Sequence, residues 1–162
     1  MIKQFIAAIA GLAVATPAMA TSWTDVNQMV ELVKGTGTDV AAIVCDDEGV
    51  MGFYNYQPEK DIDVLVVCKD NVPMNDPDAV WEVVVHEATH VMQACQGGPI
   101  LKDTYIPRVL RELQTTAPHY YQTIQQYRGD HKRVEIEAFW MELRTPAVAM
   151  NFMNKYCYKP TA

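Results

Sequence analysis

Apolar positions recur at helical spacing in four segments, which predict helices over residues 22–34, 78–96, 131–144 and 147–157. Weaker helical patterns fill 103–128, where Pro107 and Pro118 interrupt them. Between the first two helices, short apolar runs separated by turns predict three strands in a largely antiparallel sheet, at 40–45, 50–56 and 62–68. This order indicates an α+β fold, with a short sheet followed by a helical C-terminal half.

The helix over 78–96 has one apolar face and one polar face. The apolar face carries residues about one turn apart: Trp81, Val84, Val85, Ala88, Val91, Met92 and Cys95. The opposite face carries Glu82, His86, Thr89, His90 and Gln93. We therefore expect the core to lie on the first face, and a cleft or solvent on the second.

Length and composition narrow the possible classes of protein. The chain has 162 residues, of which 49 % are hydrophobic and 20 % are charged. This size and composition predict one globular domain. The formal net charge of −7 argues against nucleic acid and anionic membrane surfaces as partners.

The N-terminus has the features of a cleavable signal peptide over residues 1–20. Lys3 precedes a short apolar run over 6–14, and Ala18-Met19-Ala20 matches a small-x-small cleavage site. The run is too short for a comfortable membrane span. We expect a periplasmic or secreted protein with no stable membrane insertion after cleavage, whose single domain covers 21–162.

The four cysteines predict disulfides, because an even number in an exported chain favours them. Three connectivities are possible, and we favour Cys45–Cys68 with Cys95–Cys157. In a simple meander the first and third strands lie roughly 9–10 Å apart. The first pair therefore requires another strand order or a position beyond the strand ends. A zinc site of four cysteines is the alternative, but the chain has no C-x-x-C pair.

The polar face of the helix over 78–96 contains the sequence His86-Glu87-Ala88-Thr89-His90. Two histidines four residues apart lie on one helical face, so both imidazoles can hold one metal ion. Glu87 lies beside them, where a carboxylate can act as general base on a zinc-activated water. This is the HExxH pattern of zinc metallopeptidases.

A catalytic zinc needs a third protein ligand, and a third histidine at the HExxHxxGxxH spacing is absent. The segment from Val134 to Glu142 resembles the second motif of gluzincins, in which a ligand Glu on a downstream helix is followed three residues later by a small residue. Glu135 and Ala138 match that offset. The resemblance implies that His86, His90 and Glu135 bind Zn²⁺.

Two other glutamates compete with Glu135 for this role. Glu137, with Arg133 and Arg144 on nearby turns, is interpreted as a solvated ion-pair residue, and Glu142 as an orienting partner. Many gluzincins carry Asp or Asn where this chain has Phe139. The partner that orients the histidines must then come from elsewhere, such as Glu142, Glu82 or a backbone carbonyl.

These features lead to the hypothesis of a small, zincin-like, secreted zinc metalloendopeptidase that acts on proteins or peptides. An edge strand at 50–56 or 62–68 could hold an extended substrate, and Tyr127 or His131 could stabilise the oxyanion. Hydrolysis of cell-wall peptide amides is a variant that uses the same chemistry. The alternative is a non-catalytic, disulfide-stabilised module that binds zinc or protein.

Overall fold

The computed structural model of the chain describes residues 20–158 and shows an α+β fold with a three-stranded sheet and a helical C-terminal half. The predicted signal peptide lies outside the described residues except for Ala20. In chain order the elements are α1 (Trp23–Gly35), β1 (Asp39–Ile43), β2 (Gly52–Gln57), the 3₁₀ turn η1 (Pro58–Lys60), β3 (Ile62–Cys68), α2 (Pro77–Gln96), the 3₁₀ turn η2 (Asp103–Tyr105), α3 (Ile106–Thr116), α4 (Pro118–Ile124), α5 (Gly129–Glu142) and α6 (Pro146–Cys157).

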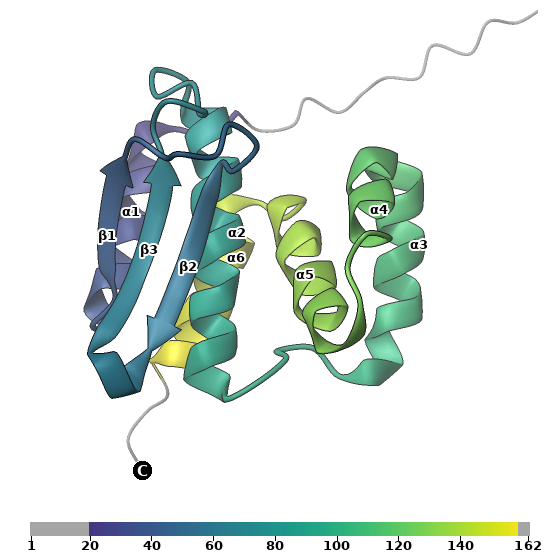
Figure 1. Cartoon of the computed structure of the whole chain (residues 1–162). Coiled ribbons are helices and arrows are strands. Elements are labelled where there is room, and N and C mark those ends of the chain that lie inside the picture. The colour runs from purple at the N-terminus through teal and green to yellow at the C-terminus, as the bar shows by residue number, and fades with distance from the viewer. Residues whose placement is uncertain (1–19, 159–162) are drawn as a thin grey trace, which may run out of the picture.

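Helix α2 lies at the centre of the molecule (Figure 1). It packs against α1, α6 and the sheet on one side and against α5 on the other. Helices α3 and α4 contact each other and α5, and together these three form the second half of the molecule. The polar face of α2 therefore faces α5 and the second half of the molecule rather than open solvent.

The sheet is mixed, and its strand order is β1-β3-β2. The third strand along the chain, β3, lies between the two earlier strands. It pairs antiparallel with β2 and parallel with β1. Its last four residues, 65–68, are buried, as expected for a central strand. Strand β2 lies at the edge beside α2, where one side of its backbone has no partner strand within residues 20–158.

Local sequence signals explain where the helices begin and end. Ser22 caps α1 in a capping box with Asp25. Asp76 caps α2 by accepting a hydrogen bond from the backbone N–H of residue 78, and the helix begins at Pro77, one residue before the predicted start. Gly97, in the left-handed conformation, ends α2.

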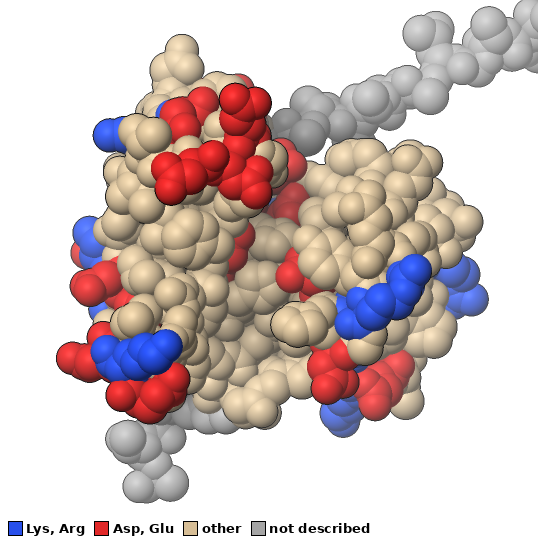
Figure 2. Space-filling view, viewed as in Figure 1, with Lys and Arg blue, Asp and Glu red and all other residues tan. Residues whose placement is uncertain are grey.

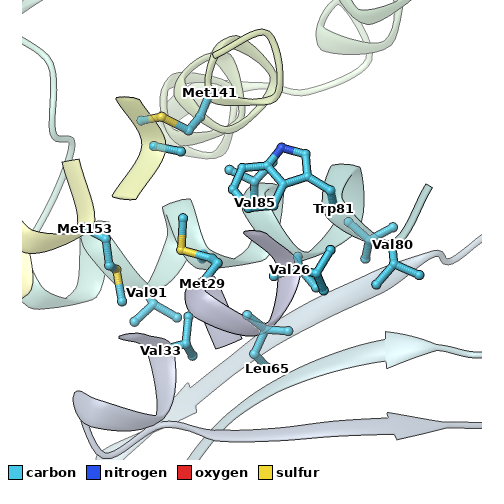
Figure 3. Packing of buried hydrophobic residues seen from close by; sticks show 14 of the residues in the cluster. Val26, Met29, Val33, Leu65, Val80, Trp81, Val85, Val91, Met141 and Met153 are labelled. Carbon is cyan, nitrogen blue, oxygen red and sulfur yellow. The ribbon is translucent and has the colours of Figure 1, made fainter. Parts of the chain in front are cut away.

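The main core lies between α1, the sheet, α2 and α6, and Figure 3 shows part of it. The predicted apolar face of α2 contributes to it, and Met141 of α5 joins it from the other half. A second, smaller cluster holds α3, α4 and α5 together through Val109, Leu113, Ile124 and Ile136. The two clusters fix α5 relative to α2, and this positioning matters for the site described below.

Both predicted disulfides are present. Cys45 is bonded to Cys68 and Cys95 to Cys157, with Cα–Cα distances of 5.4 and 5.2 Å. The first bond is possible because β1 and β3 are neighbours rather than the outer strands of a meander. The second ties the end of α2 to the end of α6. Two disulfides indicate an oxidising environment of the extracellular type.

Along residues 20–158, none of the helices combines the length and the apolar composition needed to cross a bilayer.

Gly52 allows the edge strand to approach α2 closely. A Cβ atom at this position would lie 2.5 Å from Val83 Cγ1 and 2.7 Å from the backbone oxygen of Val66. The backbone oxygen cannot move without disturbing the sheet, so there is no room for a side chain. The absence of a side chain at residue 52 therefore brings β2 against the helix that carries the histidines.

We expect Gly52→Ala to lower the free energy of unfolding by about 1–3 kcal/mol, because the added methyl group overpacks this contact. Gly49→Ala is the matched control, since its Cβ would meet only Asp47 Oδ1 at an ordinary 3.4 Å. Urea denaturation followed by circular dichroism measures both. Equal stability of the two variants would contradict the proposed role of Gly52.

Candidate metal centre

The structure brings together the three side chains predicted to bind metal. His86 and His90 come from one face of α2, and Glu135 comes from the facing turn of α5. His86 Nε2 lies 3.3 Å from Glu135 Oε2, and His90 Nε2 lies 3.5 Å from Glu135 Oε1. Ligands about 2.0–2.1 Å from a tetrahedral zinc are separated by about 3.3 Å. The spacing of these donors therefore suits one small divalent ion.

The other ring nitrogen of each histidine has an acceptor of its own. His86 Nδ1 donates to Glu142 Oε1 at 2.6 Å, and His90 Nδ1 donates to Gln93 Oε1 at 2.8 Å. In the neutral form of each ring, with the proton held on Nδ1, the lone pair is on Nε2 and points toward Glu135, where a metal ion would take the place of any proton on Nε2. Such partners fix the tautomer and orientation of metal-binding histidines.

The orientation of the Gln93 amide follows from its other contacts. Its Nε2 group donates to the backbone oxygen of Val134 at 3.0 Å and to Glu137 Oε2 at 2.9 Å. Both amide hydrogens are then used, so Oε1 must face His90. The network thus settles the tautomer of His90 without reference to any metal.

Phe139 also contributes to the site, although it cannot replace the Asp or Asn of many gluzincins. Its ring meets the His86 ring edge-on, with centroids 4.8 Å apart. Phe139 thus packs against the ring of His86, and Glu142 accepts the hydrogen bond from His86 Nδ1. Glu142 was among the orienting partners expected from the sequence, whereas Gln93 was missed. The only sign of Gln93 in the sequence was its position three residues after His90, on the same face of the helix.

Charges at the centre favour a bound cation. Glu87, Glu135 and Glu142 surround the histidines, and Oε2 of both Glu135 and Glu142 is buried without a hydrogen-bond partner. Burial lowers the pKa of His86, but the carboxylates of Glu135 and Glu142 outweigh it and raise this pKa to about 10. Burial and the neighbouring His86 lower the pKa of His90. A divalent ion suits these donors, since it would compensate the excess negative charge.

Glu87 lies beside the centre and is almost completely buried. Burial raises the pKa of its carboxyl to about 7, with Glu135 and Glu142 adding to the shift and His86 opposing it. It lines the same cavity as His86, of about 410 Å³, and this cavity is bounded by residues 49–52, Ala79, Glu82, Val83, Thr123, Tyr127, Phe139 and Glu142. A carboxyl group at the edge of a cavity, with a pKa close to neutral pH, has the properties of a general base.

The cavity has an acidic character. Among its described lining residues there are three glutamates and no Lys or Arg. Figure 2 shows Asp and Glu gathered on the upper rim of the hollow between the two halves of the molecule and within it. Tyr127 also borders this cavity, whereas the other predicted oxyanion donor, His131, is exposed on α5 and does not line it.

The prediction for Glu137 was wrong. It was interpreted as a solvated ion-pair residue, but its side chain is completely buried. It binds Arg133 at 2.6 Å, as its spacing suggested, and it also accepts hydrogen bonds from Gln93 and from the backbone of residues 100 and 101. Arg144 pairs with Glu112 instead. Glu137 is therefore not a competing ligand in this arrangement, because its carboxylate already receives four hydrogen bonds.

Comparisons with known proteins bear on the family of the chain rather than on its chemistry. Neither the curated proteins nor the solved structures give a match. The family described as "Domain of unknown function (DUF8637)" matches residues 18–158, which is most of the chain, so the protein belongs to this family.

Proposed function

We propose that this protein is an exported zinc metalloendopeptidase, with His86, His90 and Glu135 as metal ligands and Glu87 as general base. One observation carries the proposal: both Nε2 atoms converge on Glu135 while both Nδ1 atoms are occupied by acceptors. Three protein donors with an open side are typical of catalytic rather than structural zinc sites. The two disulfides support an exported location.

When bound, the ion would lower the pKa of a water molecule and polarise the scissile carbonyl. The side chains have separate tasks around it. Glu87 takes a proton and returns it to the leaving amine, which requires a carboxyl that can hold a proton near neutral pH. Its pKa of about 7 in the metal-free chain is in the right range for this exchange. Glu142 and Gln93 hold the two imidazoles in the ligating tautomer.

Strand β2 offers a way to hold a peptide substrate. It is the edge strand nearest α2, and residues 49–52 line the cavity beside His86 and Glu87. An extended peptide that pairs with this edge would lie along the cavity, with its backbone fixed by main-chain hydrogen bonds. Proteins or cell-wall peptides can both present such a segment, and Tyr127 could donate to the oxyanion from the cavity wall.

The metal assignment is tested by measuring zinc affinity with a competing chromophoric chelator. We expect wild type to bind about one zinc per chain and Glu135→Gln to bind it about 10–100-fold more weakly, because an amide oxygen is a poorer donor than a carboxylate. Asp130→Asn is the matched control, since this carboxylate is exposed and lies five residues earlier on α5. Equal affinity of both variants would refute the assignment of Glu135.

A further inference from the structure

A second cavity, of about 780 Å³, lies between α3, α5, α6 and the loop that follows α2. It shares no lining residue with the cavity beside His86. Its volume is in the range of pockets that bind small organic molecules. Neither the proposed peptidase chemistry nor the packing of the core accounts for it, so its ligand has to be deduced from its lining.

The charge of this cavity is opposite to that of the rest of the chain. Lys102, Arg108, Arg144 and Lys155 line it, against a single carboxylate, Glu112. The chain as a whole has a net charge of −7. Four cations in one cavity of an acidic protein produce a local positive potential that attracts anions.

The one carboxylate does not cancel this potential. Glu112 accepts hydrogen bonds from Trp140 Nε1, at 3.0 Å, and from Arg144, so both of its oxygens are used. Among the described residues, Lys102, Arg108 and Lys155 form no ion pair with any carboxylate. Arg108 also has a longer-range electrostatic interaction with Glu112. Lys102 and Lys155 thus remain available to a ligand, and Arg108 is held by no direct ion pair.

The floor of the cavity is aromatic and is held in place. Trp140 meets Phe152 edge-on at 5.8 Å, and Phe152 contacts Tyr156 at 6.0 Å between centroids. The guanidinium of Arg144 lies over the Trp140 ring at 4.5 Å, and the Tyr156 hydroxyl donates to the backbone oxygen of Ile100 at 2.7 Å. A row of fixed aromatic rings suits a flat apolar group.

From these two features we infer that the cavity binds a small organic anion, with a flat apolar body against Trp140 and Phe152 and an acidic group near Arg108 and Lys155. The aromatic floor supplies most of the contact area, and the cations select the charge. The inference does not depend on the proposed peptidase activity, because the two cavities share no residue.

Isothermal titration calorimetry of the full mature chain tests the inference with 2-naphthoate, its neutral amide 2-naphthamide, and inorganic sulfate. We expect saturable binding of the naphthoate at low salt, at least about tenfold tighter than the amide, and no measurable binding of sulfate alone. The double variant R108Q/K155Q should bind the naphthoate about tenfold more weakly and leave the affinity for the amide unchanged. Both side chains are exposed, so the fold should be retained.

The variant K60Q/K69Q is the matched control, because it removes the same charge from exposed positions outside the cavity. It should bind the naphthoate as wild type does. Equal losses in the two double variants would show a general effect of net charge and would overturn the inference. So would equal affinities for the naphthoate and the amide, or the absence of saturable binding.

Discussion

Glu87→Gln should reduce hydrolysis by about 10²–10⁴-fold while zinc affinity stays close to that of wild type. The substitution keeps the size of the side chain and removes only its ability to take up and return a proton. Glu87 is buried beside His86 but does not belong to the metal-binding group, so the ion should still bind. Activity would be measured on fluorescently labelled casein and on purified peptidoglycan, with zinc content determined on the same samples.

Glu82→Gln is the matched control for this experiment. Glu82 lies one turn before His86, lines the same cavity and accepts a hydrogen bond from Tyr120. Its loss changes the charge of the cavity by the same amount, and we expect activity to fall by less than about tenfold. If wild type and Glu87→Gln bind zinc equally and neither cleaves either substrate, the chain is a non-catalytic zinc-binding module and the proposed function is wrong.

Most of the fold could be predicted from the sequence because its elements carry strong local signals. The apolar face of α2, the stop at Gly97 and the three apolar runs depend on neighbours within a few residues. The strand order could not be predicted in this way. Whether β3 lies at the edge or the centre depends on pairing between distant segments, and the Cys45–Cys68 bond was the one local hint that β1 and β3 are neighbours.

The candidate site shows the same division between local and distant information. The positions of His86, Glu87 and His90 follow from helical geometry, and Glu135 was proposed by resemblance to a second motif. The contacts that orient them join α2 to α5 over 44 to 56 residues, as in Gln93 to Glu137 and His86 to Glu142. No periodicity encodes such contacts. Helical spacing therefore predicted the Arg133 partner of Glu137 correctly, but the suggested Arg144 partner and the solvated environment were both wrong.

Glu137→Gln is expected to cost about 3–5 kcal/mol of folding free energy, the second large effect predicted for this protein. Its carboxylate is completely buried and accepts hydrogen bonds from Arg133, Gln93 and the backbone N–H groups of residues 100 and 101. An amide presents two hydrogens to these donors, so it leaves several unsatisfied and removes the charge that compensates Arg133. Urea denaturation of the zinc-free chain measures the loss.

Glu112→Gln is the matched control, because Glu112 also pairs with an arginine, Arg144, but its side chain is 34 % exposed. We expect Glu112→Gln to cost less than about 1 kcal/mol of folding free energy, since solvent screens such a pair.

Zinc affinity is a second readout for Glu137→Gln, which separates a local effect from a general loss of stability. Glu137 fixes the Gln93 amide that holds His90. The variant should therefore also bind zinc about 10–100-fold more weakly under conditions where it remains folded. Unchanged zinc affinity in the folded variant would contradict this link, because the tautomer of His90 would then be set without Glu137.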